Sequence, residues 1–141
     1  MFKEIFTLDA INDLSQNTLL EHIGIQFTEI GKDYLIATMP VDSRTHQPMG
    51  LLHGGASVVL AESLGSLAAT MTLDPDLQYC VGLDINANHI KSVRTGLVEG
   101  KATPLHIGKK TQVWEIKISN PNKELVCVSR ITLAIIDKKH A

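Results

Sequence analysis

Residues 47–71 read QPMGLLHGGASVVLAESLGSLAATM, and this stretch decides the fold of the chain. From Ala56 to Met71 the residues are mostly good helix formers without a proline, which predicts one long helix. Apolar side chains fall on nearly every face of that helix, so we expect it to be buried. It is too short to cross a bilayer, which needs about 20 apolar residues, and it carries a charge midway.

That charge is Glu62, the only ionisable residue between His53 and Asp74. A carboxylate within an apolar helix costs free energy unless it is paired or hydrogen-bonded. Glu62 is therefore a candidate for acid–base or nucleophilic chemistry. The alternative is a structural carboxylate at the rim of the helix, in contact with water or a lysine.

The dipeptide Gly54-Gly55 marks the beginning of the helix, directly after His53. Glycine lets another backbone or a ligand approach closely, and the first helical turn has free N–H groups at the positive end of the dipole. Such N–H groups can stabilise a developing oxyanion. A simple turn that binds no ligand is the alternative.

Glu62 follows Gly54 by eight residues, which corresponds to about 12 Å along an α-helix. An oxyanion donor and a nucleophile or base must both reach one carbonyl group, at about 3 Å. One copy of the helix cannot readily supply both groups, whereas two antiparallel copies can, each presenting its glycine end to the other's glutamate. The sequence therefore predicts a homodimer with active sites shared across a two-fold interface.

The remainder of the chain predicts strands. We expect a short helix at residues 17–24, capped by Asn17 and ended by Gly24, and strands at residues 25–30, 34–40, 79–90, 96–102, 109–119 and 125–136. Residues 1–16 show no clear period and receive no assignment. One long helix beside antiparallel strands predicts an α+β fold in which the sheet wraps around the helix.

Composition narrows the function classes. The 141 residues suit one domain, residues 1–141, and the net charge of −2 gives no reason to expect nucleic-acid binding. No secretory or membrane-spanning segment is visible, so a cytoplasmic location away from the membrane is expected. None of the six histidines has the paired spacing of a zinc site and no phosphate or dinucleotide loop is present, so neither a metal nor another cofactor is expected.

The spacing of Gln47, the His53-Gly54-Gly55 turn, Glu62 and Ser66 resembles that of the hotdog-fold acyl-CoA thioesterases. The similarity extends from about residue 19 to residue 136, and the run GLDINANH at residues 82–89 belongs to it. It is strongest to the branch of the Arthrobacter-type 4-hydroxybenzoyl-CoA and the 1,4-dihydroxy-2-naphthoyl-CoA thioesterases. The resemblance implies a hotdog fold, hydrolysis of aromatic acyl-CoA thioesters, and a homotetramer made of two dimers.

The resemblance also implies roles for individual residues. Glu62 would attack the thioester carbonyl or activate water, the backbone N–H of Gly54 would polarise the carbonyl, and the Gln47 amide would help to orient it. Ser66, one turn after Glu62, would hydrogen-bond the glutamate or the attacking water. His53 would orient the oxyanion turn or contact the thioester, with a purely structural role as the alternative.

A CoA thioester brings phosphates, which need lysine, arginine or free backbone N–H groups. The resemblance assigns the CoA site to Gly82, His89, Ile90, Lys91, Ser92, His106, Ile107, Gly108, Lys109, Lys110 and Thr111. Ordinary solvated lysines are the alternative for the basic members of this set.

Two rival functions stay open. A hotdog hydratase or dehydratase would be expected to rely on a catalytic histidine, whereas the charged centre of this helix is Glu62. A non-catalytic acyl-CoA-binding protein would bind the thioester without turnover. Acyl carrier protein as the thiol carrier, and covalent as opposed to general-base catalysis, also stay open.

Overall fold

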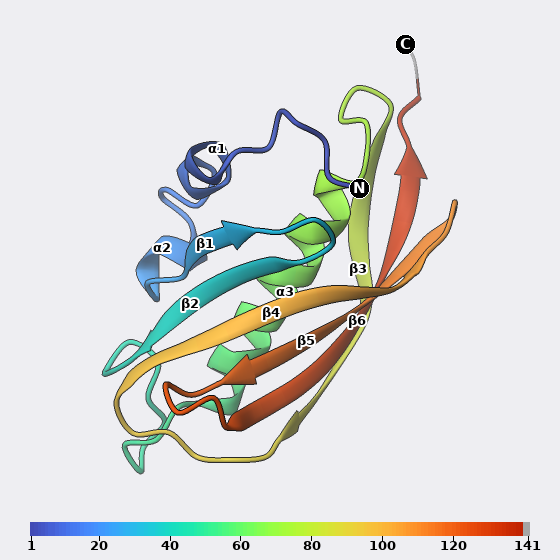
Figure 1. The fold of residues 1–141 in the computed structure, drawn as a ribbon. Coiled ribbons are helices and arrows are strands. Elements are labelled where there is room, and N and C mark those ends of the chain that lie inside the picture. Colours follow the sequence, from blue (N-terminus) through green and yellow to red (C-terminus); the bar gives the residue numbers. More distant parts are fainter. Residues whose placement is uncertain (140–141) are drawn as a thin grey trace.

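The computed structural model describes residues 1–139 and consists of one antiparallel sheet with a long helix against it (Figure 1). The helices are α1 (Leu8–Asp13), α2 (Leu19–His22) and α3 (Gly54–Met71), and the strands are β1 (Gln26–Ile30), β2 (Leu35–Val41), β3 (Gln78–His89), β4 (Gly96–Ile107), β5 (Thr111–Ser119) and β6 (Leu125–Asp137). The strand order is β1-β2-β4-β5-β6-β3. The predicted α+β architecture, an antiparallel sheet wrapped around one long helix, is confirmed.

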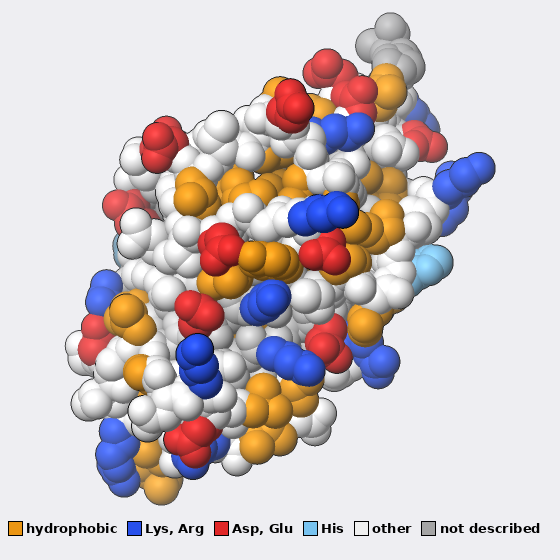
Figure 2. All heavy atoms as spheres, viewed as in Figure 1, with side chains coloured by type: hydrophobic (Ala, Val, Ile, Leu, Met, Phe, Trp, Pro, Cys, Tyr) orange, Lys and Arg blue, Asp and Glu red, His pale blue; other side chains and the backbone are white. Residues whose placement is uncertain are grey.

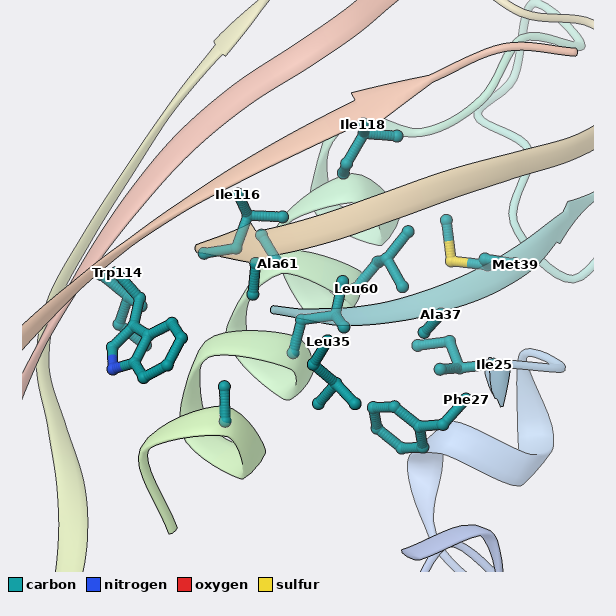
Figure 3. Close-up of a cluster of buried hydrophobic side chains, with 14 of the residues drawn as sticks. Ile25, Phe27, Leu35, Ala37, Met39, Leu60, Ala61, Trp114, Ile116 and Ile118 are labelled. Carbon is teal, nitrogen blue, oxygen red and sulfur yellow. The ribbon is translucent and has the colours of Figure 1, made fainter. Parts of the chain in front are cut away.

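Helix α3 is buried because the sheet packs closely against it. Gly55 is its only exposed residue, and Leu60 and Leu64 are completely buried among the strands. The contact is close at Gly65, where a Cβ would lie 2.4 Å from Cγ2 of Ile131 in β6. Figure 3 shows the resulting core, in which residues of α3 meet Trp114, Ile116 and Ile118 of β5 and side chains of β1 and β2.

The N-terminal region contains a helix that the sequence prediction leaves unassigned. The side chain of Thr7 caps α1, and Ile11 of α1 is completely buried. The predicted cap of α2 is wrong: the side chain of Thr18 accepts from the Leu20 N–H, while Asn17 has a positive φ of 59°. A one-turn helix of this kind has a weak periodic signal, so its cap is hard to locate from sequence.

Several other boundaries differ from the prediction, and those of α3 and β4 have a clear structural cause. Helix α3 begins two residues before Ala56, because His53 accepts from the Gly55 N–H and so caps the helix. Strand β4 runs to Ile107 instead of ending at residue 102. It passes Pro104 by a β-bulge between Pro104 and His106, which is a position where a strand tolerates proline.

Strand β3 is a long, open edge of the sheet. It pairs with β6 on one side, and among residues 1–139 no strand pairs with its other side. Tyr79, Val81 and Leu83 of this strand are apolar and 45%, 43% and 62% exposed. A strand with free N–H and C=O groups and exposed apolar side chains is a template for pairing with another chain.

The surface seen in Figure 2 carries charged side chains of both signs between small apolar patches. Among the charged side chains, Lys101 of β4 has its Nζ 4.2 Å from the ring centroid of Tyr34, and Lys117 pairs with Glu115 on β5 at 3.6 Å. None of the helices in the described part of the chain is long and apolar enough to cross a membrane.

Candidate active site

The beginning of α3 presents a free backbone donor. The Gly55 N–H donates to Nδ1 of His53 at 2.7 Å, so this ring nitrogen is unprotonated. The Gly54 N–H has no acceptor within residues 1–139. The ring of His89 lies against Gly54, where a Cβ would be 2.9 Å from Nε2. Glycine therefore allows β3 to approach the helix start while the Gly54 N–H stays available to a ligand.

Gln47 lies in a tight turn that leaves its amide group ready to donate. Its N–H donates to the Leu51 carbonyl at 2.8 Å, and Gly50 takes the positive φ of 75° that the turn requires. The side-chain Oε1 accepts from the Met49 N–H. Because the oxygen is held in this way, the NH2 group is the end of the side chain that can reach a ligand carbonyl.

A cavity of about 280 Å³ adjoins the helix start. Its lining comprises Gln47, Leu51, Leu52, Gly54, Ser57, His89, Ile90, Lys91, Ser92 and Val126. The structure thus brings Gly54 and Gln47, the two candidate carbonyl-polarising residues, together with the candidate CoA residues 89–92.

Glu62 lies elsewhere, on the part of α3 that faces Gly82 of β3. It is half-buried, and a Cβ on Gly82 would be 2.7 Å from its Oε1. Glu62 is not among the residues that line the 280 Å³ cavity. The separation between Glu62 and Gly54 that their spacing predicts is therefore found in the folded chain.

Ser66 lines a second cavity, an apolar groove of about 390 Å³ between α1 and α3. Its lining comprises Ile11, Leu14, Ser15, Thr18, Leu20, Phe27, Ser63, Ser66, Leu67 and Thr70. Sequence reasoning missed this groove, although residues 63, 66, 67 and 70 have the i, i+3, i+4, i+7 spacing of one helix face. The other wall comes from Ile11 of α1 and the residues that follow it, from α2 and from Phe27 of β1. The sequence prediction did not contain α1.

The candidate CoA residues 106–111 lie near the C-terminal end of α3. A cavity of about 620 Å³ is lined there by Met1, Thr72, Leu73, Gln78, Ile107, Gly108, Lys109, Lys110, Gln112, Ile135 and Asp137. His106 lies over Gly108, and the Thr111 carbonyl accepts from the Gly108 N–H at 2.9 Å. Within one chain, residues 106–111 and residues 89–92 are therefore not brought together.

Carboxylates accompany several of the basic side chains near these cavities. Lys91 pairs with Glu124, and this ammonium group is the main reason that the pKa of Glu124 is lowered. Lys110 is 3.8 Å from Asp137. A phosphate that binds here would meet lysines that already have partners, both of them exposed enough to exchange.

Comparison with known proteins agrees with the geometry. Residues 49–127 match the family model of the thioesterase superfamily. The 1,4-dihydroxy-2-naphthoyl-CoA hydrolase of Escherichia coli K12 is 51% identical over 136 residues, which cover 96% of this chain and 99% of the relative. A crystal structure of a thioesterase from Haemophilus influenzae is 48% identical, with a TM-score of 0.95 and 99% of each chain covered. A thioesterase variant from Pseudomonas aeruginosa is 44% identical with the same TM-score, over 97% of this chain and 99% of that one.

The Escherichia coli relative and the two solved structures cover nearly the whole chain, and the family model covers all of helix α3. The antiparallel sheet around α3 has the hotdog fold of the matching structures. The chain therefore belongs to the thioesterase superfamily and is a hotdog-fold acyl-CoA thioesterase, an enzyme that hydrolyses thioesters.

Proposed function

We propose that the protein acts as a homodimer on aromatic acyl-CoA thioesters and that each active site contains residues of both subunits. The separation of Glu62 from Gly54 along one helix carries this proposal. Both groups must contact one thioester carbonyl, so a second copy has to supply one of them.

The open edge of β3 supports the proposed pairing of two copies. Antiparallel pairing of two β3 strands about a two-fold axis would satisfy their free backbone groups and cover Tyr79, Val81 and Leu83. The family resemblance extends this arrangement to a homotetramer of two such dimers.

The positions of the two catalytic groups along β3 define a register for the pairing. Glu62 lies against Gly82, and Gly54 lies against His89. Facing residues of a symmetric antiparallel pair are equally far from the axis, and Leu83 is the extra residue of a β-bulge between Gly82 and Asp84. Placing Gly82 opposite the partner's His89 therefore puts the axis at Asn86. The same register brings Val81 to the partner's Ile90, and both residues are exposed apolar side chains in the single chain.

This register also brings the candidate CoA residues 89–92 of one subunit close to residues 106–111 of the other. Gln78, at the beginning of β3, lines the 620 Å³ cavity, and its position lies opposite residues 92–93 of the second copy. The 620 Å³ cavity of one subunit then adjoins the 280 Å³ cavity of the other. We assign the pantetheine arm to the smaller cavity and the nucleotide to the larger one, with Lys109 and Lys110 near its phosphates.

The chemistry follows from these positions. The thioester carbonyl oxygen accepts from the Gly54 N–H and the Gln47 amide of one subunit, which stabilises the negative charge of the tetrahedral intermediate. Glu62 of the other subunit attacks the carbonyl carbon, or takes a proton from a water that attacks it. The C–S bond then breaks and the CoA thiolate leaves. In the covalent route, water then hydrolyses the anhydride between the acyl group and Glu62, which releases the acid and restores the carboxylate. Ser66 orients the carboxylate or the water, and His53 holds the oxyanion turn through its cap.

The apolar groove between α1 and α3 suits an aromatic acyl group. Its walls are mostly apolar, and Ser63, Ser66 and Thr70 line the α3 side. Ser63 and Ser66 are next to Glu62 in sequence and one turn after it, so the groove begins beside the proposed reaction centre. The Escherichia coli relative is described as acting on 1,4-dihydroxy-2-naphthoyl-CoA, an aromatic thioester with polar substituents.

Mixing two inactive variants tests the shared site. Glu62→Gln removes the carboxylate, and Gly54→Pro removes the oxyanion N–H. Proline is favourable at the first helical position, and His53 already has the extended φ of −68° and ψ of 130° that precede proline. Each homodimer should be inactive in thiol release from a panel of aromatic and aliphatic acyl-CoA esters.

After subunit exchange, half of the dimers contain one intact site, so about a quarter of wild-type activity should return. Gly54→Ala keeps the N–H and is the matched control for the added side chain. No recovery on mixing would contradict sharing, and full activity of Glu62→Gln would remove Glu62 from its role. CoA binding without any turnover by the wild type would favour an acyl-CoA-binding protein.

A further inference from the structure

The turn that carries Gln47 is attached to the segment that carries Lys91 and Ser92. The Leu52 N–H donates to the Val93 carbonyl at 2.8 Å, and Nε2 of His46 lies 2.8 Å from the Arg94 carbonyl. Because a carbonyl oxygen only accepts, Nε2 of His46 carries the proton in this contact. The carbonyl groups of Val93 and Arg94 thus hold the Gln47 turn at its two ends, Leu52 and His46.

Hydrogen bonds join residues 46–52 into one small unit. His46 and Leu52 form a β-bridge, and the Gln47 N–H donates to the Leu51 carbonyl within it. The residues that flank this unit are also joined, because the His53 N–H donates to the Thr45 carbonyl at 2.8 Å. Of the side-chain hydrogen bonds formed by residues 1–139, the one from His46 alone links this unit to residues 90–95.

The 280 Å³ cavity lies between these two segments. Gln47, Leu51 and Leu52 contribute to one wall, and residues 90–92 contribute to the other. The attachments through Leu52 and His46 therefore determine how far the Gln47 amide lies from the wall with Lys91 and Ser92. A shift of about 1 Å between groups that act on one substrate is enough to lower a reaction rate severely.

We infer that His46 is a positioning residue. Its hydrogen bond to the Arg94 carbonyl holds the Gln47 amide and the Lys91–Ser92 wall at the separation at which both contact one thioester. The inference rests on the proposed function of Gln47 and of residues 90–92. His46 acts through these groups and not on the reacting atoms, and its side chain is half-buried and lies outside the hydrophobic core.

Replacement of His46 by alanine and by glutamine tests this role. His46→Ala should lower kcat/KM about tenfold, with a higher KM and a lower kcat, because one hydrogen bond and the alignment it maintains are lost. His46→Gln retains a donor and should recover kcat/KM to within about threefold of wild type. The ring donates from Nε2 in both its neutral and its protonated form, so the pH profile of His46→Gln should match that of the wild type. His22→Ala on α2 is the control and should leave both constants unchanged.

Hydrogen exchange gives a second measurement that does not depend on turnover. The Gln47 and Leu52 amide hydrogens should exchange faster in His46→Ala and return toward wild-type rates in His46→Gln. Wild-type kinetics together with wild-type exchange in His46→Ala would overturn the inference. If the wild type shows no turnover, the proposed function fails, and the exchange rates alone then decide whether His46 holds the turn.

Discussion

The two edges of the sheet are built in opposite ways. Strand β1 has five residues and a bulge between Phe27 and Glu29, and Asn12 of α1 donates to and accepts from the Phe27 backbone at 2.9 Å each. Strand β3 has 12 residues, and within the described part of the chain nothing pairs with its outer side. Figure 1 shows α1 and α2 on the β1 side of the molecule and β3 on the opposite side.

This difference indicates which edge the chain protects from association. Short edge strands, bulges and covering helices block edge-to-edge pairing, as do lysine and proline within the strand. The β1 edge is short, has a bulge and is covered by helices. Residues 78–89 of β3, in contrast, contain neither lysine nor proline. The one irregularity of β3, a bulge at Leu83 between Gly82 and Asp84, lies beside Glu62. The open edge and the proposed reaction centre are therefore the same region.

A charge on the open edge should have the largest effect. Leu83→Lys introduces a lysine on β3, and lysine on an edge strand prevents pairing with another chain in natural proteins. We expect the dimer to dissociate and acyl-CoA hydrolysis to fall by at least about 100-fold, because the completed site is lost. Gln26→Lys places the same charge on the exposed part of β1 and should keep the dimer and its activity. Analytical ultracentrifugation with thiol-release assays measures both, and an active dimeric Leu83→Lys would refute the proposed interface.

A methyl group at Gly82 tests the reaction centre while the edge stays intact. A Cβ there would lie 2.7 Å from Oε1 of Glu62, so the carboxylate must move. Gly82→Ala should lower kcat by roughly ten- to a hundredfold and leave the dimer intact. Thr132→Ala, on the neighbouring strand β6, is the control. Unchanged kcat in Gly82→Ala would show that the position of Glu62 in the active dimer differs from that in the single chain.

Removal of the Asn12 side chain tests the closed edge. Asn12→Ala leaves the part-buried N–H and C=O of Phe27 without their partner and should lower the free energy of unfolding by about 2–3 kcal/mol. Asn12→Asp keeps the acceptor for the Phe27 N–H but turns a carboxylate oxygen toward the Phe27 carbonyl, so it should not restore wild-type stability. Urea unfolding at one fixed protein concentration provides the measurement, and kcat should not change. A negligible loss of stability would indicate that packing of α1 protects this edge without help from the hydrogen bonds.

Thiol reactivity should give the smallest signal. Burial raises the pKa of the Cys80 thiol on β3 and that of the Cys127 thiol on β6, so little reactive thiolate exists at neutral pH. Alkylation of Cys80 by iodoacetamide should be slow at neutral pH and accelerate as the pH rises. Cys127, which is completely buried, should react only on unfolding. Faster modification of Cys80 in Leu83→Lys, followed by mass spectrometry, would support the covered edge, and equal rates would argue against it.

Local signals account for what could be predicted well. The position of α3 follows from its uninterrupted helix formers, and β5 follows from its alternation of buried and exposed residues. The prediction ended β4 at residue 102 and left residues 1–16 unassigned, because a bulge after Pro104 and a helix held by Ile11 depend on distant neighbours. For the site, the spacing of Glu62 and Gly54 along one helix was sufficient to predict that they stay apart.

The amino-acid sequence by itself determined the long helix, the strands around it and the family, because helix propensity, strand alternation and motif spacing are properties of neighbouring residues. Only the tertiary structure decided that Gly82 lies against Glu62, that residues 89–92 and 106–111 occupy opposite ends of the molecule, and that α1 completes a groove beside Ser66. It also decided which edge of the sheet stays open. These features depend on strand order and on packing between residues far apart in the chain, and no local pattern encodes them.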